Sequence, residues 1–313
     1  MIEAINKVKG AVAKKDLLPI LTHLHFYSGR VQGSNGKIVI DAPCPDASLN
    51  ITVPLDPFVK ALQACPGEPV LEVIGNNVRV TCGRFKADIA IDNSNLYPVM
   101  GPDLNPHSCG EFLEALIILE PFMGSDASRD WACGINLSHG FAYATNNVSL
   151  VKSAITFEGQ ANISSNTVNE LVRLCNQPTG IAYGTNTATF HYDDGTWVKS
   201  QLIAKAWPDI SGFFKRSENM LPVDKDLLDD IMRVIPFATK KTPTIKFCED
   251  GIFVQGDNKE AEVTGYIFPT AFFRAEPLVE VLRVATEIDF STYPKPCYFV
   301  GDGIEGVIIG CLG

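Results

Sequence analysis

Two pairs of adjacent aspartates are the residues in this 313-residue sequence best suited to acid–base or metal chemistry. Asp193 and Asp194 stand in a Tyr-Asp-Asp-Gly turn, where a solvated surface is the simpler interpretation. Asp229 and Asp230 lie in a helical pattern, in which adjacent side chains point to different faces. The five histidines show no spacing typical of metal ligands, and no serine-hydrolase, P-loop, dinucleotide-binding or zinc-protease motif occurs. The sequence therefore predicts no catalytic residue, no cofactor and no metal site.

The cysteines and the apolar segments indicate the cellular environment. Nine cysteines are scattered without a Cys-x-x-Cys pair, which predicts buried thiols in a reducing compartment rather than a zinc site or a redox dithiol. Residues 2–15 are amphipathic and dotted with lysine, and they lack the apolar core of a signal peptide. The apolar run at 116–123 is far shorter than a membrane span. We therefore expect a cytoplasmic protein.

Basic residues gather on the amphipathic segments of the chain, although the net charge is −10. An acidic total argues against a simple basic nucleic-acid-binding protein. Two interpretations stay open: solvated helix faces, or helices from several domains that face one polyanion while the acidic excess lies elsewhere. The pattern is weakest at 111–123, which carries three glutamates and no base. The basic residues on these segments or at their ends are Lys7, Lys9, Lys14, Lys15, Lys60, Arg173, Arg233, Lys240, Lys241, Arg274 and Arg283.

A ten-residue helical pattern recurs three times and must position these charges. Residues 56–65, 166–175 and 276–285 each begin 110 residues after the previous copy. In each copy the apolar side chains fall at helical period on one face. Asp-Pro and Glu-Pro open the first and third copies, and proline is well tolerated in the first turn of a helix. The spacing predicts three copies of one domain.

Each copy extends beyond this helix. A second amphipathic segment precedes it, at 2–15, 111–123 and 225–241, and runs of β-prone residues separated by Gly/Asn/Asp turns follow both segments. The order helix, strands, helix, strands predicts an α+β fold with two helices packed on antiparallel sheets in each domain. Pro/Gly/Asn-rich boundaries divide the chain into domains at 1–103, 104–218 and 219–313.

Four segments, taken in order, resemble one known family. They are KKDLLPILTHLHF (14–26), GRFKADIAI with the following LYP (83–98), GFAYATNNVSLVKSAI (140–155) and SQLIAKAWPDISGFF (200–214). Together they resemble the bacterial DNA sliding clamp, the β subunit of DNA polymerase III, over all three expected domains. No single segment is specific to the family, but their ordered set is. The short chain suggests a divergent, phage-encoded version.

The resemblance implies a ring that holds duplex DNA by topology. Two three-domain subunits would join head to tail as a homodimer, with sheets outside and helices lining the hole, and would tether the replicative polymerase after loading by an ATP-dependent partner. The helices would contact phosphates without reading sequence. Lys15 occupies the position of the family's DNA-contacting basic residue before Leu-Pro-Ile-Leu. The other basic residues are predicted from helix charge alone.

The resemblance also implies two protein-binding surfaces. The head-to-tail interface maps to Phe85 in the first domain and to Ile235 and Phe237 in the third, with an ordinary core position as the alternative for Phe237. The cleft for polymerase and loader tails departs from the family at 146–149 and 308–313, so we expect a changed peptide specificity. Its matching positions are Thr145, Asn147, Val148, Leu150, Pro208, Phe213, Val307, Ile309, Gly310 and Cys311.

The prediction is therefore a non-catalytic DNA polymerase processivity factor. The alternative from another class is an enzyme on a repeated α+β scaffold, which a pocket with converging titratable side chains would favour. A further alternative keeps the fold and changes the stoichiometry, because three domains per chain give six in a dimer and nine in a trimer.

Overall fold

The computed structural model describes residues 1–45, 48–94, 96–157 and 159–312. The chain folds into two compact units, one formed by Met1–Leu113 and Asn169–Leu202, the other by Glu114–Val168 and Ile203–Gly313. No helix in the described part of the chain is long and apolar enough to cross a membrane.

An eight-stranded antiparallel sheet is the centre of the first unit, in the order β4-β1-β2-β3-β15-β14-β13-β8. It joins strands from the first predicted domain to strands from the second through the pair β3 and β15. Its strands are β1 (His23–Tyr27), β2 (Arg30–Ser34), β3 (Ile38–Pro43), β4 (Ile51–Pro54), β8 (His107–Ser108), β13 (Gly180–Tyr183), β14 (Thr187–His191) and β15 (Trp197–Gln201).

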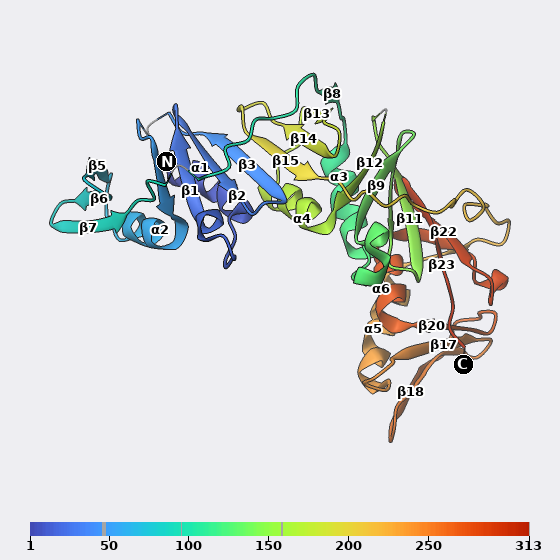
Figure 1. Cartoon of the computed structure of the whole chain (residues 1–313). Helices are drawn as coiled ribbons and strands as arrows, with labels where there is room; N and C mark the ends of the chain where they lie inside the picture. The colour runs from blue at the N-terminus through green and yellow to red at the C-terminus, as the bar shows by residue number, and fades with distance from the viewer. Residues whose placement is uncertain (46–47, 95, 158, 313) are drawn as a thin grey trace. The chain divides into compact units, whose positions relative to one another are not determined.

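A small sheet and three helices complete this unit (Figure 1). The antiparallel sheet β5-β6-β7 comprises β5 (Val70–Ile74), β6 (Asn77–Cys82) and β7 (Phe85–Ala90). Helix α1 packs on β2 and β3, and α2 packs on β4 and β7. Buried Phe58 of α2 meets buried Phe26 of β1 edge to face, with ring centroids 5.6 Å apart. The helices are α1 (Ile2–Val8), α2 (Leu55–Gln63) and most of α4 (Ser165–Leu174), with short 3₁₀ turns at Lys9–Ala11 and Pro19–Thr22.

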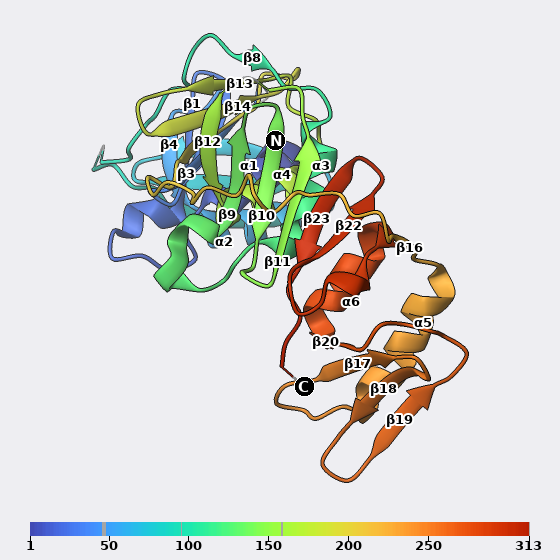
Figure 2. The same ribbon diagram turned by 90° about the vertical axis from the view of Figure 1, so that its right-hand side faces the viewer.

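The second unit repeats this plan with a second eight-stranded antiparallel sheet, β12-β9-β10-β11-β23-β22-β21-β16. Figure 2 shows β10 and β11 continuing sideways into β23 and β22, with α6 packed nearby. The pair β11 and β23 joins strands of the second predicted domain to strands of the third. The strands are β9 (Gly134–Ser138), β10 (Phe141–Thr145), β11 (Ser149–Ala154), β12 (Gln160–Ser164), β16 (Leu221–Pro222), β21 (Ala285–Ile288), β22 (Cys297–Gly301) and β23 (Ile304–Ile308).

A four-stranded antiparallel sheet, β19-β18-β17-β20, lies beside α5 and α6 in the same unit. Its core is aromatic: Phe247 stacks on Phe290 at 4.7 Å and meets Phe268 edge to face at 5.0 Å. The strands are β17 (Thr244–Cys248), β18 (Gly251–Gln255), β19 (Glu260–Val263) and β20 (Ala271–Arg274). The helices are α3 (Phe112–Leu119), most of which belongs to this unit, α5 (Lys225–Val234) and α6 (Ala275–Val284), with 3₁₀ turns at Glu120–Phe122, Ala127–Ala132, Ile235–Phe237 and Phe290–Thr292.

These elements confirm the predicted α+β fold with helices on antiparallel sheets. The three-domain division stays a prediction, because the two compact units divide the chain differently: each large sheet fuses strands of two successive predicted domains. The first helix of each repeat is shorter than predicted and ends in a 3₁₀ turn. In two of them the turn contains Pro121 or Pro236, which lack the N–H that an α-helix needs at that position.

The prediction of buried cysteines is wrong for part of the set. Only four of the nine are buried, at positions 44, 109, 248 and 297. Cys175 is exposed, because it follows α4 in a left-handed conformation (φ 55°) rather than continuing the apolar face of that helix. Cys65, the last residue of the first helical pattern, is half-buried.

Candidate nucleic-acid interface

A hollow of about 630 Å³ in the first unit brings together predicted DNA contacts from two predicted domains. Lys9 and Lys14 follow α1, and Arg173 lies in the last turn of α4. Asp56 and Glu170 also line the hollow, so its charge is mixed. Sequence reasoning did not place Arg173 beside the lysines, because α4 and α1 are far apart in the sequence and come together in the tertiary structure, where β3 pairs with β15.

Two of the predicted DNA contacts in this unit, Arg173 and Lys7, are bonded to other residues of the same unit. The guanidinium of Arg173 donates to the carbonyl oxygens of Asn6 (2.9 Å) and Lys7 (2.6 Å) and to Glu170 (2.7 Å), so it caps the carboxyl end of α1. The ammonium of Lys7 lies 2.6 Å from Asp194, and this hydrogen bond raises the pKa of Lys7. Both side chains hold the unit together, which limits what they can offer to a phosphate.

Other lysines in this unit are exposed. The ammonium groups of Lys14, Lys15 and Lys60 make no hydrogen bond or ion pair with another described residue, and that of Lys9 donates only to the Asn6 side chain, at 2.9 Å. Lys14 and Lys15 precede a loop on which Leu17 is 99% exposed. An unpaired ammonium group on a flexible stem can follow a phosphate backbone without a fixed geometry.

The predicted DNA contacts of the second unit also divide into residues with an ion pair and exposed residues without one. Arg233 pairs with Asp230 at 2.6 Å, and Arg283 pairs with Glu280 at 2.7 Å, each three residues apart on one helix. Arg233 also borders a hollow lined by four aspartates, so its surroundings are acidic. Among the predicted DNA contacts of this unit, the exposed residues without an ion pair to another described residue are Lys240, Lys241 and Arg274.

The predicted cleft lies on the large sheet of the second unit. Leu150 and Val307 are opposite one another on β11 and β23, and with Tyr298 they form a buried apolar floor. The partly buried side chains packed against this floor are Trp207, Ile210, Phe214, Met220 and Val300. The structure therefore brings Leu150 and Val307 together, as predicted.

Other predicted cleft positions differ. Pro208, Phe213 and Ile309 are exposed, whereas their neighbours Trp207 and Phe214 pack on the floor. Sequence reasoning chose Phe213 and missed Phe214, because an irregular segment has no periodicity that separates its inward from its outward side chains. The signal available in the sequence was the pair of adjacent aromatic residues, Phe213 and Phe214, either of which could face the floor.

The loop between β10 and β11 forms the cleft's polar border. The Thr145 hydroxyl donates to the Ser149 carbonyl at 2.7 Å and accepts from the Asn147 amide at 3.1 Å. Asn147 has a φ of 69°, in the left-handed region, which asparagine adopts more readily than most residues that carry a β-carbon. The Val148 carbonyl accepts from the Ile309 amide at 2.8 Å, which fixes the chain after β23 to this loop.

The last predicted cleft residues are tied to another sheet. The Cys311 amide donates to the Phe272 carbonyl of β20 at 2.8 Å, and its own carbonyl accepts from the Tyr293 hydroxyl at 2.7 Å. Gly310 lies so close to the Tyr293 ring that a β-carbon there would overlap it. These contacts hold Gly310 and Cys311 against β20.

A salt bridge connects β11 and β23, the two strands that carry Leu150 and Val307 of the cleft floor. Lys152 of β11 lies 2.7 Å from Glu305 of β23 and sits over the Phe141 and Phe214 rings at 4.7 and 4.5 Å. Burial opposes ionisation of Glu305, but hydrogen bonds from Lys152 and Tyr298 outweigh it and lower the pKa of Glu305. Glu305 is thus ionised at neutral pH.

The predicted subunit-interface residues lie beside the two smaller sheets: Phe85 on an edge strand, and Ile235 and Phe237 in a turn that contacts β18. Phe85 is half-buried on β7, an edge strand of its sheet. Ile235 is half-buried and Phe237 is 43% exposed in the 3₁₀ turn after α5, with the Lys259 ammonium 5.8 Å from the Phe237 ring. An ordinary core position is therefore wrong for Phe237.

One cluster of titratable side chains bears on the enzyme alternative. Asp41 is fully buried and accepts hydrogen bonds from Tyr27 (2.5 Å), Arg30 and Gln32 (3.0 Å). His25 stacks on the Tyr27 ring at 5.3 Å, and burial lowers its pKa. The carboxylate is fully occupied by its own neighbours, which is typical of a structural network. Among the described residues no group of three or more His, Cys, Asp and Glu side chains could hold a metal ion.

No protein-family model matches the chain, and no curated protein matches it in sequence. Solved structures do match over its full length. The beta subunit of DNA polymerase from Streptococcus pyogenes matches with a TM-score of 0.86 at 18% identity, over 100% of this chain and 97% of that one. This chain has the fold of a bacterial sliding clamp.

Further matches agree. The DnaN sliding clamp (DNA polymerase III subunit beta) of Pseudomonas aeruginosa, bound to griselimycin, matches with a TM-score of 0.85 at 17% identity, and a putative DNA polymerase III beta subunit of Eubacterium rectale with 0.85 at 12%. Each match covers 100% of this chain and 97% of the other. The resemblance seen in the sequence is confirmed at the level of the fold.

Proposed function

We propose that this protein is a DNA sliding clamp, a processivity factor that encircles duplex DNA and tethers a replicative DNA polymerase. The observation that carries the proposal is the sliding-clamp fold over the entire chain, with TM-scores of 0.83–0.86 to bacterial clamps and 97% of those chains covered. A match of this extent includes every repeated helix pair, so it supports the whole ring-forming architecture rather than one module.

Topology would hold the DNA, and weak phosphate contacts would let it slide. The exposed, unpaired cations are suited to such contacts, because each neutralises a phosphate without a fixed geometry. The paired Arg233 and Arg283 would contribute less, since each already neutralises a carboxylate. A net charge of −10 would keep DNA away from the rest of the surface. The cations proposed to contribute most are Lys9, Lys14, Lys15, Lys60, Lys240, Lys241 and Arg274.

The apolar floor of Leu150, Tyr298 and Val307 would receive the short tails of a polymerase and of a clamp loader. Its walls, Trp207 and Phe214, are large aromatic side chains, which commonly anchor peptide interfaces. We expect a peptide specificity different from that of host clamps. A consensus host polymerase tail that binds this protein as tightly as it binds the host clamp, measured for both proteins by the anisotropy of a fluorescently labelled tail, would contradict this part.

The deciding experiment compares circular and linear DNA. The protein is loaded onto a nicked plasmid by a bacterial clamp loader with ATP, the complex is isolated by gel filtration, and half of it is cut with a restriction enzyme. A topological clamp stays on the circle and slides off the cut ends. Equal retention on both DNAs would refute the proposal.

A further inference from the structure

The two large sheets are each closed by the same kind of strand junction. In the first unit β3 pairs with β15, and in the second β11 pairs with β23, both antiparallel. Each junction joins the end strand of a four-stranded set, β4-β1-β2-β3 or β12-β9-β10-β11, to the end strand of a three-stranded set, β15-β14-β13 or β23-β22-β21, which a two-residue strand (β8 or β16) extends on its far side. The third four-stranded set ends in β19, and the remaining three-stranded set ends in β7. Both β19 and β7 stand at sheet edges with one side unpaired among the described strands.

Side-chain exposure also marks an incomplete third junction. In the middle repeat the 3₁₀ turn after the first helix faces the neighbouring repeat. Phe122 in the middle repeat is fully buried, and its turn contacts α6 and β11. Phe237 holds the same place in the third repeat and is 43% exposed. The difference is what a missing neighbour would produce.

The hairpins identify the equivalent residues on the first side of the junction. Lys152 of β11 lies opposite Tyr143, the third residue of β10. Glu262 of β19 lies opposite Phe253, the third residue of β18. Glu262 is therefore the counterpart of Lys152.

The residues on the other side of the junction are matched in the same way. Glu305 is the second residue of β23 after a two-residue turn. Lys86 is the second residue of β7, also after a two-residue turn. Lys86 is therefore the counterpart of Glu305, and the two charges of the Lys152–Glu305 pair reappear with their signs exchanged.

The sliding-clamp resemblance implies a head-to-tail dimer in which an edge strand of the first domain meets one of the third. We propose that this interface pairs β7 with β19 antiparallel, in the register that sets Lys86 opposite Glu262 of the partner subunit. This register rests on the proposed clamp function, and it assigns the residues that would close the ring. It reproduces the internal pair in which Lys152 lies 2.7 Å from Glu305.

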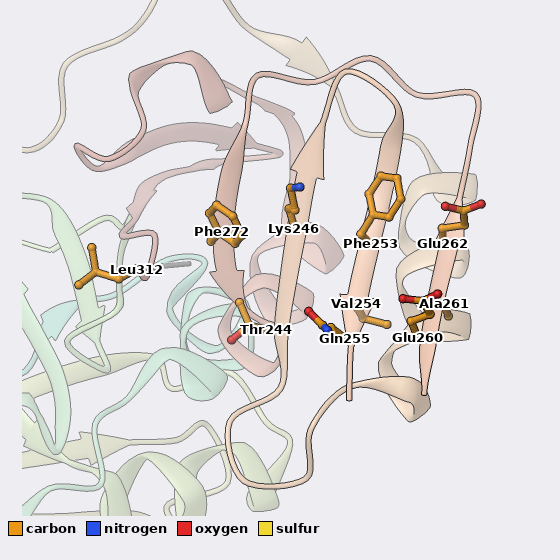
Figure 3. Close-up of a pocket in the computed structure, with 10 residues that line it drawn as sticks. All are labelled: Thr244, Lys246, Phe253, Val254, Gln255, Glu260, Ala261, Glu262, Phe272 and Leu312. Atoms are coloured by element: carbon orange, nitrogen blue, oxygen red, sulfur yellow. The ribbon is translucent and has the colours of Figure 1, made fainter. Parts of the chain in front are cut away.

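The alternation of exposed and half-buried side chains along β7 and β19 agrees with this register. Lys86 and Glu262 are exposed, and Figure 3 shows Glu262 on the outermost strand on the same face as Phe253. The alternating residues Ala87 and Ala261 are half-buried on the other face, and the register sets them opposite each other. A shift by one residue would place apolar side chains against charges on every strand position.

One neighbouring pair opposes the register and makes it testable. Asp88 would lie opposite Glu260 of the partner subunit, and like charges at such positions are unfavourable. Arg79 offsets this, because it binds Asp88 through two hydrogen bonds of 2.7 and 2.9 Å, which lower the pKa of Asp88. A shift by two residues would instead set Lys86 opposite Glu260, so the two registers name different partners for one lysine.

Charge exchange distinguishes these registers. Lys86→Glu and Glu262→Lys each replace an attraction by a repulsion, so we expect each single variant to raise the dimer dissociation constant about tenfold at low salt. The double variant Lys86→Glu/Glu262→Lys restores the attraction and should return within about threefold of the original constant. The matched comparison is Glu260→Lys with and without Lys86→Glu: this change replaces the repulsion between Asp88 and Glu260 by an attraction in either background, so its effect on the dissociation constant should be the same in both. Sedimentation equilibrium measures every variant, and thermal unfolding verifies that each one is folded.

The outcomes separate the two proposals. The register is supported if Glu262→Lys weakens the dimer alone but strengthens it beside Lys86→Glu, while Glu260→Lys has the same effect in both backgrounds. Coupling of position 86 to Glu260 and not to Glu262 overturns the register while the dimer stands, and so does the absence of coupling to either. An original protein that stays monomeric at every concentration overturns the dimer itself, and the register with it.

Discussion

Equivalent residues occur at the closed junction, where β11 pairs with β23, and on the open edges β7 and β19, which have no neighbouring strand on one side among the described strands. At the closed junction the Lys152 side chain is only 15% exposed and bonded to Glu305, whereas Lys86 and Glu262 on the open edges are both exposed. Phe122 is buried and Phe237 is not. The comparison teaches that equivalent side chains of a repeated fold differ in exposure when only one of them has its neighbouring repeat in the same chain.

The largest expected difference concerns the two phenylalanines. Phe122→Ala leaves a cavity in a packed core, so we expect the free energy of unfolding to fall by about 3–5 kcal/mol. Phe237→Ala removes a side chain that is 43% exposed, and a decrease below about 1 kcal/mol is expected for the monomer. Urea denaturation at a protein concentration below the dimer dissociation constant measures both. Equal decreases would contradict the view that the two turns differ only in being covered.

Phe237, unlike Phe122, should affect association of two subunits rather than the stability of one. Phe237→Ala is expected to weaken the dimer by about 2 kcal/mol, because an aromatic side chain at an interface centre commonly carries that much binding energy. Phe122→Ala should leave the dimer dissociation constant of the folded protein within about threefold of its original value, because its site lies inside one chain. Sedimentation equilibrium tests this. A larger effect of Phe122 than of Phe237 on association would reverse the assignment.

The ion pair of the closed junction should show a defined pH dependence. The pKa of Glu305 is lowered in the folded protein, so its stabilisation is present above the unfolded value of about 4.3 and is lost as the pH falls through the folded value. Lys152→Met should cost about 1 kcal/mol at pH 7 and should reduce this acid-dependent destabilisation. Urea midpoints between pH 7 and pH 3 provide the measurement. A Lys152→Met variant with an unchanged pH profile would mean that the pair does not stabilise the junction.

The smallest effect is expected where unpaired and paired cations are compared for DNA. Lys14→Ala and Lys15→Ala together should lower the slope of log K against log salt for linear duplex DNA by about 0.9 for each phosphate that is no longer neutralised. Arg283→Ala should change the slope less, because Arg283 already pairs with Glu280 at 2.7 Å. Fluorescence anisotropy over a salt series measures both slopes. If Arg283→Ala has the larger effect, ion pairing does not determine which cations reach DNA.

Much of the fold followed from local patterns. The helices at α2, α4 and α6 lie where the 110-residue repeat predicts them, because apolar residues at helical period must face a core. Helix ends were less well predicted, and the 3₁₀ turns at Pro121 and Pro236 show why: proline stops an α-helix without stopping the apolar pattern.

The candidate site was only partly predictable. Lys14 and Lys15 are exposed as expected, but Arg173 is occupied by carbonyl oxygens of α1, including that of Lys7, which lies 166 residues away in the sequence. Trp207 and Phe214 were missed in favour of the residues that adjoin them, because irregular segments carry no orientation signal.

The sequence by itself determined the repeat, the α+β class and the absence of recognisable catalytic motifs, since these depend on local periodicity and short spacings. Only the tertiary structure decided which cations are free, which aromatic side chains form the cleft floor and walls, and which strand edges stay open. Those properties depend on partners distant in sequence. Sheet pairing brings Lys152 to Glu305 and leaves Lys86 and Glu262 on open edges, and no local pattern distinguishes a charge that has found its partner from one that has not.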